Sequence, residues 1–176
     1  TGTAPKILLN ADRTIGIFKL ISPSSRTFRI DKVGDNPITF SNGPTVSYRL
    51  ETNGASNSTN GRKISIACPE EGTLFIGGYT GTAGRGYTVE TSDGTVVSSA
   101  YAGNLPLAPE SGDFSVQTVA IPSAGTYVIN PDAAIYYGYV QFVAGPSSIE
   151  DGANLGKEEV SAEYYTILGV KLQEEP

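Results

Sequence analysis

Histidine and tryptophan are absent from this 176-residue sequence, and it contains a single cysteine. Histidine is the side chain most often used as a general base and is a principal zinc ligand, and soft-metal clusters need several thiolates. Most familiar catalytic arrangements and Cys/His metal sites therefore cannot be built. We expect a protein without catalytic residues.

Charge is also scarce, since 17% of the residues are charged and the net charge is −6, with no long run of Lys or Arg. Nucleic-acid affinity depends on neutralising phosphates, so nucleic acid is not expected as a partner. No apolar run approaches the roughly 20 residues that cross a bilayer, so a membrane is not expected either. Methionine is absent too, which predicts an excised or processed fragment.

The single cysteine, Cys68, lies in an alternating apolar run in phase with Ile64 and Ile66. A reactive thiol needs an activating partner, and the commonest one, histidine, does not occur. We predict a buried structural thiol rather than a nucleophile. It forms no intrachain disulfide.

What the sequence does contain is a series of short segments rich in Val, Ile, Thr, Tyr and Phe, closed by Gly, Pro, Asn, Asp or Ser. This pattern is typical of an antiparallel β-sandwich or barrel. The predicted strands are Lys6–Asn10, Ile15–Ile21, Thr27–Val33, Ile38–Ser41, Val46–Thr52, Arg62–Cys68, Thr73–Tyr79, Tyr87–Thr91, Thr95–Tyr101, Phe114–Ile121, Thr126–Asn130, Ile135–Val143 and Glu163–Leu172. No convincing helix is evident.

These strands fit one domain over residues 1–172, with a core at about 38–143, and residues 173–176 resemble the start of a linker. Asp93-Gly94 predicts a tight hairpin between Tyr87–Thr91 and Thr95–Tyr101. Three longer connections, Asn53–Gly61, Thr80–Gly86 and Ala102–Gly112, are rich in turn residues. Loops of this kind often carry specificity in sandwich proteins.

The ten tyrosines concentrate in the segment Ile135–Val143. If Val140 and Phe142 point into the core, strand alternation puts Tyr136 with them and turns Tyr137, Tyr139 and Gln141 outward together. An outward row of rings would form a platform for the apolar face of a sugar. The alternative is that these tyrosines pack under loops or against another sheet.

A second candidate site involves Tyr79 and Tyr87, which flank a loop containing Arg85, with Tyr101 approaching from the next hairpin. These residues would form a pocket at one end of the sandwich. Arg85 serves equally well as an anchor for its own loop. Two further tyrosines, Tyr48 and Tyr127, alternate with apolar residues and are predicted to lie in the core.

Two catalytic functions are alternatives to these binding hypotheses. Glycoside hydrolysis needs paired carboxylates, but the acidic residues other than the tail fall mostly where turns are expected. These residues are Asp31, Asp35, Glu70, Glu71, Asp93, Glu110, Asp113 and Asp132. Lyase chemistry would need a basic residue, and the candidates Arg49, Arg62, Lys63 and Arg85 are scattered without a motif.

From Ile38 to Val143 the sequence resembles the β-sandwich modules appended to pectate lyases and other polysaccharide-degrading enzymes of gut and rumen bacteria. The resemblance is carried by the following segments: Ile38-Thr39-Phe40-Ser41, Tyr48-Arg49-Leu50-Glu51, Gly61-Arg62-Lys63-Ile64-Ser65-Ile66, Gly72-Thr73-Leu74-Phe75-Ile76, Arg85-Gly86-Tyr87-Thr88-Val89 with Asp93-Gly94, Ala120-Ile121-Pro122-Ser123-Ala124-Gly125-Thr126-Tyr127, and the aromatic strand at Ile135. It covers about 60% of the chain.

The resemblance implies a jelly-roll-like β-sandwich that binds a polysaccharide or oligosaccharide without cleaving it. Such a module is extracellular or attached to the bacterial surface and is covalently linked to catalytic or surface modules. The family also implies a structural calcium ion as an option, although no ligand spacing identifies one. The acidic balance favours a neutral glycan over polygalacturonate.

A different class remains open, in which the chain is a structural or adhesive β-sandwich domain of a bacterial surface protein. Such a domain would space other modules or bind a protein. An isopeptide crosslink between a lysine and an asparagine would favour this class.

Overall fold

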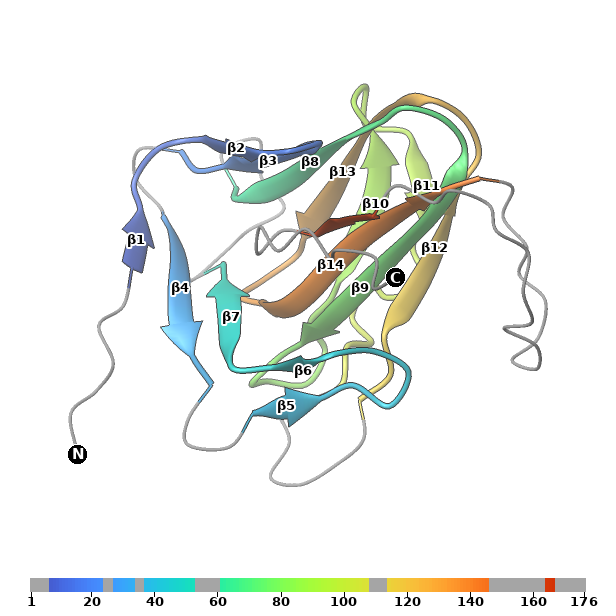
Figure 1. Cartoon of the computed structure of the whole chain (residues 1–176). Helices are drawn as coiled ribbons and strands as arrows, with labels where there is room; N and C mark the ends of the chain where they lie inside the picture. The colour runs from blue at the N-terminus through green and yellow to red at the C-terminus, as the bar shows by residue number, and fades with distance from the viewer. Residues whose placement is uncertain are drawn as a thin grey trace, which may run out of the picture.

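The computed structural model describes residues 7–23, 27–33, 37–52, 61–107, 114–145 and 164–166. Within these ranges the chain is all β-strand and turn, and the strands form two large antiparallel sheets and one short ribbon (Figure 1). The all-β antiparallel prediction is therefore confirmed. Residues 53–60 and 108–112, from two predicted loops, and the predicted linker 173–176 lie outside the described residues.

Sheet A has seven strands, and six of them follow one another edge to edge. Their order is β1 (Ile7–Leu9), β4 (Phe28–Lys32), β7 (Tyr48–Glu51), β14 (Tyr136–Ala144), β9 (Gly72–Tyr79) and β12 (Gln117–Ile121). The seventh, β15 (Tyr164–Thr166), pairs with the end of β14. Strand β14 therefore lies centrally and contacts three neighbours.

Sheet B has six strands, of which β2, β3 and β8 run across the top of the view in Figure 1. Their order is β11 (Val96–Ser98), β10 (Tyr87–Thr91), β13 (Gly125–Pro131), β8 (Lys63–Cys68), β3 (Phe18–Ile21) and β2 (Arg13–Ile15). The remaining ribbon pairs β5 (Ile38–Thr39) with β6 (Thr45–Val46). Antiparallel sheets joined largely by turns and loops are typical of sandwich-like domains.

The main core lies between the inner faces of the two sheets. Strand β8 contributes Ile64, Ile66 and Cys68, whereas the intervening Lys63, Ser65 and Ala67 are half-buried or exposed. The buried Cys68 thiol is free, and burial raises its pKa to about 12. The prediction of an inert structural thiol is confirmed by its burial.

The predicted Asp-Gly hairpin is confirmed, because β10 pairs with β11 through a turn in which Gly94 has a φ of 91°. Asp93 accepts hydrogen bonds from the Thr91 hydroxyl and from the Thr95 backbone N–H. These bonds lower the pKa of Asp93. The same hydrogen bonds stabilise the turn.

Two predicted strands are in fact each divided into two. The segment predicted as Ile15–Ile21 is a hairpin of β2 and β3, because Gly16 takes a left-handed φ of 56° at the turn. The segment predicted as Val46–Thr52 is broken at Ser47, whose carbonyl accepts from the Val33 N–H. There the chain passes from the ribbon into sheet A.

Of the two tyrosines predicted to lie in the core, one was placed correctly. Tyr127 is buried, and its hydroxyl donates to the Ser123 carbonyl at 3.0 Å. A hydroxyl that bonds back to nearby upstream backbone is the arrangement of a tyrosine corner. Tyr48 is 52% exposed, so its prediction is wrong. Its strand, β7, begins there, beyond the edge of the core.

A second apolar cluster lies on the outer face of sheet A, beneath the β5–β6 ribbon. Its buried members are Ile38, Phe40, Val46, Tyr79, Phe114 and Val116. Two glycines of sheet A make room for the Phe40 ring, since a Cβ at Gly77 would come within 2.7 Å of it and one at Gly138 within 3.1 Å. Sheet A is therefore covered on both faces over part of its area.

Candidate functional site

The predicted tyrosine platform on β14 is interrupted by a bulge. The pairing of β14 with β9 shifts register between Tyr137 and Tyr139, so Gly138 and Tyr139 both lie on the outer face. Val140 and Phe142 point into the core as predicted. In the part of β14 that precedes the bulge, the inward-facing and outward-facing residues are therefore the reverse of those predicted.

The prediction that Tyr137 faces solvent is wrong, because Tyr137 is 2% exposed and belongs to the main core. Tyr136, which was predicted to point inward, instead lies half-buried on the outer face. Burial and the nearby Asp132 charge raise the pKa of Tyr137, so its hydroxyl stays neutral. An inserted residue in a strand produces this inversion, and strand periodicity alone does not reveal it.

The other two members of the predicted platform, Tyr139 and Gln141, do share the outer face of sheet A. Tyr139 is half-buried, and its hydroxyl donates to Gln141 Oε1. Gln141 is 8% exposed and stands opposite Thr166 of β15. These two side chains are hydrogen-bonded to each other and do not form an exposed surface on which a sugar ring could stack.

The predicted pocket around Arg85 is also only partly assembled. Tyr87 and Tyr101 come together, with ring centroids 5.6 Å apart, and Tyr87 is buried. The Tyr101 hydroxyl contacts both the N–H and the carbonyl of Thr118, each at 3.3 Å, on edge strand β12. The Arg85 carbonyl accepts from the Leu105 N–H at 3.1 Å. Tyr101 and Arg85 thus hold strand and loop backbone in place.

Tyr79 does not join that group, because it lies in the outer cluster, stacked on Phe114 at a centroid distance of 5.3 Å. It is 1% exposed. Burial raises the pKa of Tyr79, and a hydrogen bond from Arg49 acts in the opposite direction. That bond links Tyr79 to a cluster that the sequence analysis did not identify.

The cluster lies on the outer face of strands β4 and β7, and we call it the charged quartet (Arg29, Asp31, Arg49 and Glu51). Arg29 stands opposite Glu51, and Asp31 opposite Arg49, in the register of the two strands. The intervening Ile30 and Leu50 face the main core. Alternation therefore brings two cations and two anions to one face in complementary positions.

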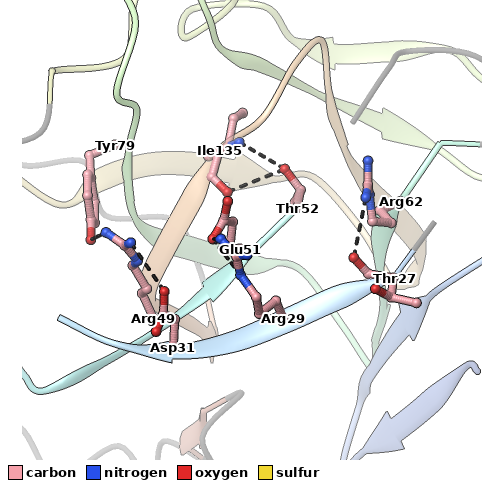
Figure 2. A network of polar contacts seen from close by, with 9 residues as sticks. All are labelled: Thr27, Arg29, Asp31, Arg49, Glu51, Thr52, Arg62, Tyr79 and Ile135. Carbon is pink, nitrogen blue, oxygen red and sulfur yellow. Dashed lines mark hydrogen bonds and ion pairs between the residues drawn. The ribbon is translucent and has the colours of Figure 1, made fainter. Parts of the chain in front are cut away.

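Both cross-strand pairs are bonded (Figure 2). Arg29 Nε donates to Glu51 Oε2 at 2.9 Å, and Arg49 Nη2 donates to Asp31 Oδ2 at 3.5 Å. The two arginine side chains are 21% and 22% exposed, whereas those of Glu51 and Asp31 are 7% and 12% exposed. The arginine side chains are therefore the more accessible part of the quartet.

Aromatic rings complete the site next to Arg49. Its guanidinium carbon lies 4.1 Å from the centroid of the Tyr136 ring, and Nη1 donates to the Tyr79 hydroxyl at 3.4 Å. Burial alone would lower the pKa of Arg49, but the Tyr79 bond and the nearby acidic groups raise it, so Arg49 stays charged. Stacking on an aromatic face is favourable for arginine. Its buried Nε has no hydrogen-bond partner.

Backbone contacts fix the position of these groups. Buried Thr52, which follows β7, donates its N–H to the Ile135 carbonyl at 3.0 Å. Its hydroxyl accepts from the Ile135 N–H at 2.8 Å and donates to the Ile135 carbonyl at 3.3 Å (Figure 2). The end of β7 is thus joined to the start of β14. As a result Glu51 and Tyr136 stand opposite each other across the two strands.

Both carboxylates of the charged quartet accept hydrogen bonds from guanidinium groups, Glu51 from Arg29 and Asp31 from Arg49. Asp31 lies within strand β4, in agreement with the predicted strand Thr27–Val33, so its grouping with the turn carboxylates is wrong. Arg62, a candidate lyase base in the sequence, is 1% exposed and donates to the Thr27 carbonyl. Among the described residues, no three His, Cys, Asp or Glu side chains gather as metal ligands.

One signal in the sequence pointed to the quartet. Arg29-Ile30-Asp31 and Arg49-Leu50-Glu51 both alternate charge with an apolar residue inside predicted strands. If two such strands pair antiparallel, opposite charges meet. The pairing partner of each strand was not predictable, and so the match was missed.

Comparison with known protein families and with curated proteins finds no match for this chain. In the part that the structure describes, no helix is long and apolar enough to span a membrane. The site must therefore be interpreted from its own chemistry.

Proposed function

We propose that this chain is a non-catalytic carbohydrate-binding module, with its ligand site at the charged quartet and the adjoining Tyr136. The observation that carries the proposal is the Arg49 guanidinium, held 4.1 Å over the half-buried Tyr136 ring and 3.5 Å from Asp31. Sugar hydroxyls need paired donors and acceptors, and a pyranose C–H face packs on aromatic rings. This face carries both kinds of group, with Arg49 over one side of the Tyr136 ring and Tyr79 packed 5.1 Å from it.

The wider proposal follows the resemblance described above. We infer a jelly-roll arrangement of the two sheets, an extracellular or cell-surface location, and covalent attachment to catalytic or surface modules. The ligand is a polysaccharide or oligosaccharide of plant or dietary origin. A structural calcium ion belongs to the same resemblance, and no described residue is assigned to it.

A neutral glycan suits this site better than an acidic one. The chain carries a net charge of −6, which repels polyuronates at long range. Each arginine of the quartet already faces a carboxylate, so little positive charge is left for an anionic ligand. The guanidinium and carboxylate groups remain suited to neutral hydroxyls.

Affinity electrophoresis against starches, xylans, glucans, mannans and pectins tests the proposal. The protein should be retarded by at least one neutral glycan, and Arg49→Lys should weaken binding by about tenfold, which corresponds to about 1.4 kcal/mol. Lysine keeps the charge but loses the planar fork that bonds and stacks. The same incubations should release no reducing ends and no unsaturated products.

Lys19→Arg on sheet B is the matched control, because it also preserves charge and its side chain is about half exposed on the opposite side of the molecule. It should bind like the parent protein. Circular dichroism in the aromatic region verifies that both variants are folded. Absence of retardation by every glycan, or equal binding by Arg49→Lys, would contradict the proposed site.

The second candidate function is a structural or adhesive domain of a bacterial surface protein. One observation favours it, since three of the tyrosines expected to bind ligand, Tyr79, Tyr87 and Tyr137, are at most 2% exposed. In that case the quartet would only stabilise the sheet. The glycan panel separates the two functions, because this class predicts no retardation.

A further inference from the structure

A row of side chains crosses the outer face of sheet A at right angles to its strands. In the register of the sheet, Leu8 of β1 stands opposite Arg29 of β4, and Arg29 stands opposite Glu51 of β7. Glu51 in turn stands opposite Tyr136 of β14, and Tyr136 stands opposite Tyr79 of β9. Directly opposed residues share one face of a sheet, so these five side chains form a line across five neighbouring strands (Figure 1). We call this line the transverse row.

The two ends of the transverse row differ in their access to solvent. At the β9 end, Tyr79 is 1% exposed, and its ring is stacked on Phe114 in the outer cluster beneath the β5–β6 ribbon. At the other end, Leu8 is 54% exposed, and β1 is the outermost strand of the sheet. In the described part of the molecule, a ligand at the half-buried Tyr136 can therefore extend toward β1 but not toward β9.

The open part of the transverse row combines polar and apolar groups without net charge. Arg29 Nε donates to Glu51 Oε2 at 2.9 Å, so the charges at the centre of the row compensate each other. An aromatic ring, Tyr136, lies on one side of this pair, and the aliphatic Leu8 lies on the other. From Leu8 to Tyr136 the row covers three strand spacings, or about 14 Å. A single pyranose ring is much shorter than this, so only a chain of several sugars would contact both ends.

We infer that the ligand of this face is a neutral oligosaccharide chain that lies along the transverse row, with Leu8 as an apolar subsite at its far end. One sugar contacts the exposed part of Tyr136 beside Arg49. The next sugar crosses the Arg29–Glu51 pair, where the guanidinium group donates to its oxygens. A further sugar packs its C–H face on Leu8 and removes apolar surface from water.

This inference rests on the proposed carbohydrate function and adds to it the direction of the bound chain, a preference for longer ligands and a residue that produces this preference. Ile7 provides a matched control on the same strand, because it is 56% exposed. It stands opposite Ile30, which packs against the main core, so Ile7 lies on the other face of sheet A. Threonine is favourable in strands, and its substitution for either exposed residue should leave the fold intact.

Isothermal titration calorimetry tests the inference with a disaccharide and a tetrasaccharide prepared from the neutral glycan that retards the protein most. The parent protein should bind the tetrasaccharide at least about tenfold more tightly than the disaccharide. Leu8→Thr should weaken tetrasaccharide binding about fivefold, because less apolar surface is covered, and disaccharide binding by less than about twofold. Ile7→Thr should bind both ligands like the parent protein. Circular dichroism verifies that both variants are folded.

Failure of the inference is distinguishable from failure of the proposed function. Binding that is weakened by Arg49→Lys but is equal for the two ligands, or is unaffected by Leu8→Thr, would overturn the inference and leave the quartet as the site. Equal losses in Leu8→Thr and Ile7→Thr would overturn it as well, since the effect would not belong to one face. A parent dimer that Leu8→Thr dissociates in analytical ultracentrifugation would assign Leu8 to a second copy of the chain and overturn it. No binding of any glycan would contradict the proposed function itself and this inference with it.

Discussion

The outer faces of the two sheets differ in what covers them. On sheet A, the β5–β6 ribbon packs over Phe40, Tyr79 and Phe114, and beside it lies the charged quartet. On sheet B, the described outer face carries mainly small or polar side chains, such as Thr88, Ser65 and Lys19. Sheet A is buried on both sides in places, whereas sheet B follows the ordinary pattern of one buried face.

This difference explains for which strands the inward-facing residues could be predicted from the sequence. Strand β8 of sheet B alternates apolar and polar residues, so its inward face was assigned correctly. Strands β9 and β14 of sheet A place aromatic and apolar residues on both faces, and glycines admit the Phe40 ring. Where both faces are apolar, a period of two no longer identifies the inner one.

The largest expected effect concerns the covering of sheet A. Phe40→Ala should lower the free energy of unfolding by about 3–5 kcal/mol, because it empties the centre of the outer cluster. Val128→Ala on the half-buried outer face of sheet B should cost less than about 1.5 kcal/mol. Urea denaturation measures both. Similar costs for the two variants would mean that the faces do not differ as described.

The next effect concerns the charged quartet. Glu51→Ala should cost about 2–3 kcal/mol, since it leaves the Arg29 guanidinium partly buried without its carboxylate. The double variant Arg29→Met/Glu51→Leu should recover most of that loss, because no unpaired charge remains. Chemical denaturation of the single and double variants gives the comparison. A double variant no more stable than Glu51→Ala would show that packing, rather than charge pairing, was lost.

A smaller effect is expected at the glycine that seats Phe40. Gly77→Ala should cost about 1–3 kcal/mol, because the added Cβ would overpack the cluster by meeting the Phe40 ring at 2.7 Å. Gly81→Ala is the matched control, since its Cβ would make only ordinary contacts at 3.7 Å. Thermal unfolding of both proteins compares them. A Gly77→Ala variant as stable as the control would contradict the close approach of ribbon and sheet.

The smallest expected effect is the pH-dependent contribution of Asp12, next to sheet B, to the free energy of unfolding. The Ser22 N–H, followed by Lys19, lowers the pKa of Asp12 below its ordinary value. Because the pKa of Asp12 is lower in the folded protein than in the unfolded chain, where it is about 3.9, the ionised carboxylate stabilises the fold at pH values above about 3.9. This stabilisation is lost as the pH falls through the pKa of the folded state. Because Asp12 is largely exposed, Asp12→Asn should cost less than about 1 kcal/mol at pH 7. The difference should vanish by about pH 2 in urea titrations; an equal difference at both pH values would contradict this.

Much of the strand pattern, the absence of helix in the described residues, the Asp-Gly hairpin and the buried Cys68 were predictable, because each rests on local alternation or turn chemistry. The β14 bulge was not, since a register shift depends on the neighbouring strand β9. The quartet also depends on pairing between β4 and β7, which local sequence does not specify. Residues fixed by long-range register were therefore the ones placed wrongly or missed.

Nuclear magnetic resonance mapping tests the central proposal most directly. A ¹⁵N-labelled sample is titrated with the glycan that retards it most, and backbone amide shifts are followed. We expect the largest shifts at Arg29, Asp31, Arg49, Glu51 and Tyr136, with little change at Ser65, Thr88 and Glu90. Shifts concentrated on sheet B, or no shifts with any glycan of the panel, would contradict a carbohydrate site on the outer face of sheet A.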